Sequence, residues 1–140
     1  MVEGAYPPAI IVHSGAQALA AAEAATALGR PLTLRSAPGG TLGVGWFASL
    51  GALLAERHPM LDLTLVLDCA DEAGMALGAL RRGLKVIRVD GSVAVRAKLG
   101  ALAATYGARL DEDRRPPLDL AGELLERADL AARCRDWLMR

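Results

Sequence analysis

The stretch LDLTLVLDCADEAGMALGALRRGLKVIRVD, from Leu61 to Asp90, decides the fold class of this chain. An apolar run ends at Asp68, a segment rich in helix-forming residues follows, and a second apolar run ends at Asp90. A strand, a helix and another strand joined by short turns predict two parallel strands with a right-handed crossover.

The same alternation extends in both directions along the chain. The other predicted strands are Ala9–His13, Pro31–Ser36 and Ala108–Asp111. The other predicted helices run from Ser14 to Leu28, from Thr41 to about Glu56, from Ser92 to about Tyr106, and from about Asp119 onward. Gly29 follows the first helix and can take the left-handed conformation that ends many helices.

These elements predict a single α/β domain over residues 1–140, because 140 residues suffice for one domain with a core and are too few for two. A complete eight-stranded barrel is excluded, since it needs roughly 250 residues. We expect a three-layer αβα arrangement with a five-stranded parallel sheet in the flavodoxin-like order 2-1-3-4-5. The alternative is a half-barrel of five βα units that a partner completes.

Composition excludes several classes of protein. Hydrophobic residues make up 53% of the chain, so a disordered protein is excluded. Sixteen basic residues balance 16 acidic ones, which gives no support to nucleic-acid binding. Cys69 and Cys134 lack the spacing of a metal site, so we expect no metal, and we expect no cofactor. The N-terminus does not resemble a signal peptide, and the longest uncharged apolar segment, Thr41–Ala55, is too short to span a bilayer. We therefore expect a cytoplasmic protein without membrane contact.

The expected site lies beyond the carboxyl ends of the strands, where the strand order reverses. In the order 2-1-3-4-5 this point lies between the first and third strands, which end at His13 and Asp68. A histidine oriented by a carboxylate can act as an acid or base, so His13 and Asp68 are the candidate catalytic pair. Cys69 is a poor candidate nucleophile, since the neighbouring carboxylate raises the pKa of a thiol.

Polar and glycine residues in the neighbouring loops are candidates for binding an anion. Arg35 could clamp an anionic group, and the Gly39–Gly40 turn offers backbone N–H groups without side-chain bulk. The full set of candidate ligand-binding residues is Ser14, Arg35, Ser36, Gly39, Gly40, Thr41, Asp71 and Asp90. Several of them have a structural alternative: Ser14, Thr41 and Asp71, like Ser92, stand where helix N-caps belong, and the glycines can simply form a turn.

Two functions follow from these patterns. The first is a non-catalytic binding or regulatory module that acts through self-association or a protein partner, since the sequence holds no complete catalytic signature. The nearly uncharged segment TLGVGWFASLGALLAE, Thr41–Glu56, then predicts a homodimer. The second is a small enzyme or ligand-binding protein for a phosphorylated or carboxylated metabolite at the strand ends. Flavin binding is disfavoured, because the loops at the strand ends contain no Trp or Tyr.

Overall fold

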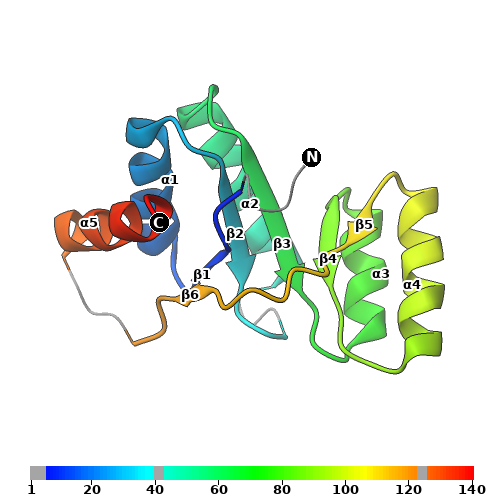
Figure 1. Cartoon of the computed structure of the whole chain (residues 1–140). Helices are drawn as coiled ribbons and strands as arrows, with labels where there is room; N and C mark the ends of the chain where they lie inside the picture. Colours follow the sequence, from blue (N-terminus) through cyan, green and yellow to red (C-terminus); the bar gives the residue numbers. More distant parts are fainter. Residues whose placement is uncertain (1–5, 40–42, 123–125) are drawn as a thin grey trace.

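The computed structural model describes residues 6–39, 43–122 and 126–140, and it has an α/β fold with a parallel sheet (Figure 1). The strands of the sheet are β1 Ile10–Val12, β2 Leu32–Ser36, β3 Leu63–Asp68, β4 Val86–Arg88, β5 Arg109–Leu110 and β6 Leu118–Asp119. The helices are α1 Gly15–Leu28, α2 Val44–Arg57, α3 Ala73–Arg81, α4 Val93–Thr105 and α5 Arg127–Leu138. The predicted α/β class with a parallel sheet is confirmed.

The strand order is β5-β4-β3-β2-β1-β6, so the expected order 2-1-3-4-5 is wrong, and the sheet has six strands rather than five. Strand β2 pairs with β1 on one side and with β3 on the other, because Leu34 lies opposite both Ile10 and Leu65. Strands β1 to β5 are therefore consecutive neighbours, as the half-barrel alternative implies. Strand β6 belongs to neither prediction, since its residues fall where the last helix was expected to begin.

The segment between β5 and β6 carries the chain from one edge of the sheet to the other, and Figure 1 shows it in orange running past the intervening strands. At the far edge, the backbone N–H of Leu118 donates to Ala9 O at 2.9 Å, and that of Leu120 donates to Ile11 O at 3.1 Å. Helix α5 then packs against α1. The first and last elements of the chain thus lie side by side.

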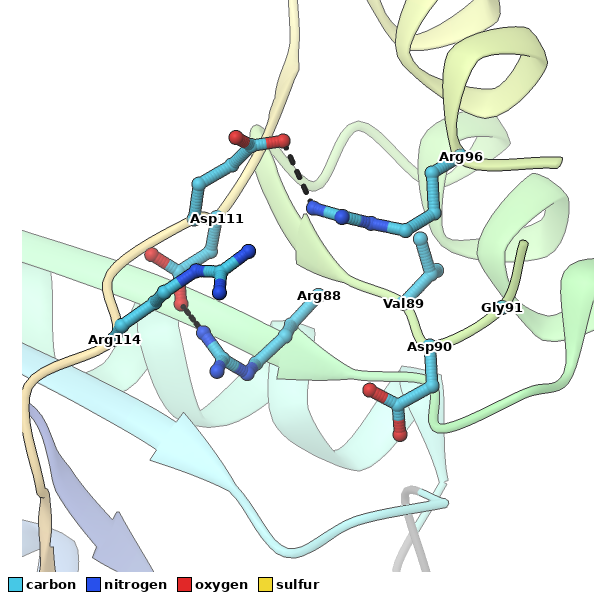
Figure 2. Close-up of a pocket in the computed structure, with 8 residues that line it drawn as sticks. Arg88, Val89, Asp90, Gly91, Arg96, Asp111 and Arg114 are labelled. Carbon is cyan, nitrogen blue, oxygen red and sulfur yellow. Dashed lines mark hydrogen bonds and ion pairs between the residues drawn. The ribbon is translucent and has the colours of Figure 1, made fainter. Parts of the chain in front are cut away.

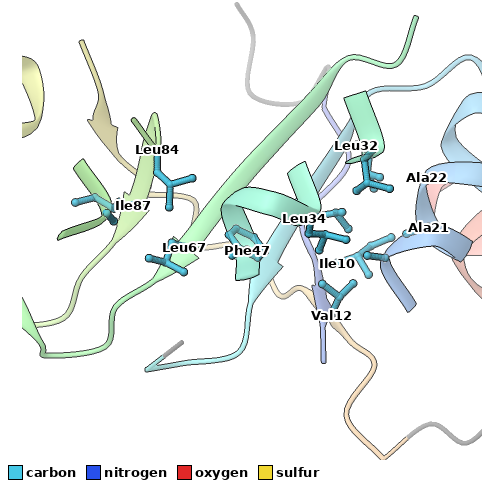
Figure 3. Close-up of a cluster of buried hydrophobic side chains, with 14 of the residues drawn as sticks. Ile10, Val12, Ala21, Ala22, Leu32, Leu34, Phe47, Leu67, Leu84 and Ile87 are labelled. Atoms are coloured by element: carbon cyan, nitrogen blue, oxygen red, sulfur yellow. The ribbon is translucent and has the colours of Figure 1, made fainter. Parts of the chain in front are cut away.

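One face of the sheet packs against the helices. Side chains alternate between the two faces of a strand, and Ile10, Leu34, Leu67 and Ile87 all point to the face that forms the hydrophobic core (Figure 3). Helices α1 to α4 contact one another in chain order, as right-handed crossovers between consecutive strands require. The three-layer αβα arrangement, expected from the alternation of strands and helices, stays a prediction, whereas the strand count and order differ from those expected.

The opposite face of the sheet carries polar and charged side chains. Thr33 and Thr64 are register partners on this face, and Asp68 is the register partner of Arg88. A hollow of about 600 Å³ over these strands is lined jointly by sheet residues and by the segment that follows β5. The segment from β5 to β6 therefore covers part of the face that the core does not use.

The helix boundaries are explained by their caps. Ser14 Oγ accepts from the backbone N–H of Gln17 at 3.2 Å, and Ser92 Oγ accepts from that of Val95 at 3.1 Å, so both predicted caps are confirmed. Gly29 ends α1 with φ 63°. The interpretation of Asp71 as a cap is wrong, because Glu72 occupies the N-cap position of α3.

Helix α2 buries most of its apolar surface within the chain. Phe47, Leu50 and Leu54 are buried, whereas Leu53 retains 39% of its accessible surface. Packing against the sheet and the neighbouring helices thus accounts for much of the uncharged character of this helix, and homodimerisation through it stays a prediction. Among the described residues, no helix combines the length and apolar character that crossing a membrane requires.

Candidate functional site

His13 and Asp68, the expected catalytic pair, end strands that are not neighbours, because β2 lies between β1 and β3. His13 pairs instead with Asp119 at the end of β6, with 2.6 Å between Nε2 and Oδ1. Asp119 Oδ1 also accepts from the backbone N–H of Ala121 at 2.9 Å. Burial opposes ionisation of Asp119, but the hydrogen bonds from His13 and Ala121 outweigh it and hold the pKa of Asp119 below its usual range.

Three of the predicted ligand-binding or catalytic residues, Ser36, Gly39 and Asp68, do come together. The backbone N–H of Asp68 donates to Ser36 Oγ at 2.9 Å, and that of Gly39 donates to Asp68 O at 3.0 Å. The buried Asp68 carboxylate accepts from the backbone N–H of Ala70 at 2.9 Å. Ala70 has φ 50°, a conformation that costs energy in a residue other than glycine. One role of Asp68 is therefore to hold the loop after β3.

The remaining candidates from the sequence are scattered. Ser14 caps α1, and Asp71 is exposed in the loop before α3. Gly40 and Thr41 lie outside the described residues. Asp90 is exposed after β4 and lies in a pocket, described below, with residues that the sequence analysis does not single out.

Cys69 is chemically unsuited to nucleophilic attack. Burial, with added repulsion from Asp68 and Glu72, raises the pKa of the Cys69 thiol to about 12. A thiol with this pKa is protonated at neutral pH, and only the thiolate is a strong nucleophile. The sequence-based argument against Cys69 agrees with this result.

A group of paired charges lies where β2, β4 and β5 end. Arg88 Nη1 donates to Asp111 Oδ2 at 2.9 Å and to Asp113 O at 2.9 Å. Arg35 Nη2 lies 3.6 Å from the same oxygen of Asp111. The Arg35 side chain is only 6% exposed, and its Nε has no hydrogen-bond partner among the described residues. Burial lowers the pKa of Arg35, the nearby Arg88 lowers it further, and Asp111 and Asp68 oppose this change.

A pocket of about 330 Å³ opens beside this group, between the ends of β4 and β5 and the start of α4 (Figure 2). It is lined by Arg88, Val89, Asp90, Gly91, Arg96, Asp111, Glu112 and Arg114. We call it the arginine pocket, because Arg88, Arg96 and Arg114 reach it from β4, α4 and the segment after β5, respectively. In Figure 2 the side chains of Arg96 and Arg114 point toward each other, with Arg88 beside Arg114.

Two groups in the arginine pocket lack a partner in the described part of the chain. Arg88 pairs with Asp111, and Arg96 Nη2 pairs with Glu112 Oε1 at 2.9 Å. Neither the Arg114 guanidinium nor the Asp90 carboxylate has a hydrogen bond or ion pair there. Both are exposed. The pocket thus presents one unpaired cation, Arg114, and one unpaired carboxylate, Asp90, beside two paired arginines whose guanidinium groups have further N–H donors.

The sequence gives little signal for the arginine pocket: of the residues that line it, only Asp90 is among the candidate ligand-binding residues. The missed residues that bear charge are Arg88, Arg96, Arg114, Asp111 and Glu112. One signal is visible in the sequence: Arg88 stands near the carboxyl end of a predicted strand, where an isolated charge calls for a partner. Arg96 and Arg114 give no such signal, because exposed arginines are common on helices and loops.

The residues that line the arginine pocket include no adjacent pair of nucleophile and base. No family model matches the chain, and no curated protein matches it.

Proposed function

We propose that this protein binds a small anionic ligand in the arginine pocket at the carboxyl ends of β4 and β5. The observation that carries the proposal is the Arg114 guanidinium, which has no acceptor among the described residues and lines the same pocket as Arg88 and Arg96. The pocket lies beyond the carboxyl ends of the strands, the edge at which open parallel sheets bind ligands, although the strand order does not reverse between β4 and β5.

The charges around the pocket favour an anion. Guanidinium groups remain protonated in proteins, so three of them close together repel one another. Asp111 and Glu112 pair with Arg88 and Arg96. Asp90, the third acid of the lining, forms no pair with Arg114, so an anion beside Arg114 would give that guanidinium its partner. The pocket also lies at the N-terminal end of α4, since Gly91 lines it and α4 begins at Val93. The positive end of the helix dipole adds to the attraction of an anion.

The rival interpretation is that these arginines only stabilise the fold through ion pairs. It accounts for Arg88, whose side chain is 27% exposed and which joins β4 to the segment after β5. It assigns no role to Arg114, because this exposed side chain forms no such pair among the described residues. Replacing Arg114 therefore distinguishes the two interpretations.

The test is thermal unfolding with inorganic phosphate or malonate, compared with sodium chloride at equal ionic strength. A ligand at 100 times its dissociation constant stabilises the folded state by about 2.7 kcal/mol. We expect phosphate or malonate to raise the midpoint of wild type and of Arg81→Ala, an exposed arginine on α3, but not of Arg114→Ala. Equal midpoints in both anions and in chloride would exclude the arginine pocket as an anion site.

A further inference from the structure

We infer that the arginine pocket takes a phosphate monoester of a small hydroxylated molecule, with the phosphate at the three arginines and a hydroxyl group at Asp90. This inference rests on the proposed function and specifies its ligand class. It depends on the number and origin of the arginines, on the unpartnered carboxylate of Asp90, and on the size of the pocket.

The three arginines favour phosphate over carboxylate. A carboxylate has two oxygens in one plane and is satisfied by a single guanidinium fork. A phosphate monoester has three terminal oxygens in a tetrahedral arrangement, so it can accept hydrogen bonds from several directions. Arg88, Arg96 and Arg114 come from three different elements and approach the pocket from different sides (Figure 2). The positive end of the helix dipole, at the N-terminus of α4, also favours a doubly charged anionic group.

Asp90 favours a ligand that also carries a hydrogen-bond donor. Asp90 is one of the residues that line the pocket, and its carboxylate has no partner among the described residues, so it is open to accept hydrogen bonds. A carboxylate beside a bound phosphate is repulsive unless the ligand places a donor against it. A hydroxyl group adjacent to the phosphate ester provides that donor. A simple dicarboxylate provides none.

The volume of the pocket limits the size of the ligand. At about 330 Å³ it lies at the lower end of the range for small-molecule sites, roughly 300 to 1,000 Å³. A phosphorylated molecule of a few carbon atoms fits this volume better than a nucleotide, which needs room for a base as well as a sugar.

Isothermal titration calorimetry tests the inference with three probes: glycerol 3-phosphate, inorganic phosphate and malonate. We expect wild type to bind glycerol 3-phosphate at least tenfold more tightly than malonate. We expect binding to strengthen as pH rises through about 6, where the phosphate loses its second proton. Arg114→Ala should weaken binding of both phosphates at least tenfold, whereas Arg81→Ala should leave it unchanged.

Asp90→Asn tests the hydroxyl contact, and this exposed substitution leaves the fold in place. It should reduce the preference for glycerol 3-phosphate over inorganic phosphate at least fivefold. An unchanged preference would overturn the hydroxyl contact. Malonate binding as tightly as glycerol 3-phosphate would overturn the ligand class but keep the proposed function. Failure of all three probes to bind would overturn both.

Discussion

Arg88 Nη1 lies 2.9 Å from Asp111 Oδ2, and this contact joins the end of β4 to the residue that follows β5. The same oxygen is 3.6 Å from the guanidinium of Arg35, so one carboxylate serves two arginines. Asp111 is only 10% exposed, which makes this ion pair less screened by water than a surface pair. It is also the contact that places Arg88 at the edge of the arginine pocket.

Asp111→Asn should destabilise the protein by about 2 to 3 kcal/mol, because it leaves two arginines with low exposure without their counter-charge. Urea unfolding at neutral pH measures this change. The matched control is Glu112→Gln, which removes an ion pair whose acid is 67% exposed. That pair should contribute less than about 1 kcal/mol. Equal losses in the two variants would contradict the assigned role of Asp111.

Asp113 should make stability depend on pH in the acid range. The hydrogen bond from the Arg115 side chain holds the pKa of Asp113 below its usual range, although burial partly opposes this. A carboxyl whose pKa is lower in the folded state contributes stability above its unfolded pKa of about 3.9. That contribution is lost as pH falls through the folded pKa. The difference in unfolding free energy between wild type and Asp113→Asn should therefore be largest near pH 6 and should shrink below about pH 4.

The two glycines Gly51 and Gly78 should respond oppositely to replacement by alanine. A Cβ at Gly51 in α2 would overlap Leu65 Cδ1, so Gly51→Ala forces Leu65 to move and should cost about 1 to 2 kcal/mol. A Cβ at Gly78 in α3 meets nothing within 4 Å, so Gly78→Ala should gain about 0.5 to 1 kcal/mol from helix propensity. Thermal and urea unfolding of the two variants check this pair, and a loss of stability in Gly78→Ala would be inconsistent with the packing of α3.

Cys69 should not react with iodoacetamide in the folded protein at neutral pH. Its side chain is fully buried and its thiol has a pKa of about 12. Cys134 is buried as well, so the native protein should gain no label, whereas the urea-unfolded chain should gain one label at each cysteine. Mass spectrometry of tryptic peptides reads both sites. Rapid labelling of Cys69 in the folded state would contradict this placement.

The sequence predicts the local elements of this fold better than their order. Ser14, Ser92 and Gly29 mark helix ends through local chemistry, so their positions follow from the sequence. The strand order depends on which faces of the strands meet helices, and an almost wholly apolar stretch such as Ala9–His13 is typical of a strand covered on both faces. The segment LTLRS in β2 alternates instead, and its polar Thr33 and Arg35 lie on the face away from the core.

The candidate site could be predicted only in part. Asp90 could be predicted as a site residue because it ends a predicted strand. The ion pair of His13 with Asp119 could not be predicted, because the sequence favours Asp119 as the beginning of a helix, whereas it lies in a strand beside β1. Arg88 and Arg114 are 26 positions apart in the sequence numbering, and only the path of the chain after β5 brings them together. No local pattern encodes that path.

The pairing of β6 with β1 has a consequence for the order of events during synthesis. Strands β1 to β5 can assemble as each βα unit emerges, since every contact joins neighbours along the chain. The outer edge of β1, however, keeps its backbone groups unpaired until residues 118–119 arrive. The nascent chain therefore exposes an open strand edge from the emergence of β1 until that of β6, and such an edge is a template for aggregation. Chains that terminate before Leu118 should keep this edge permanently and should accumulate as insoluble protein.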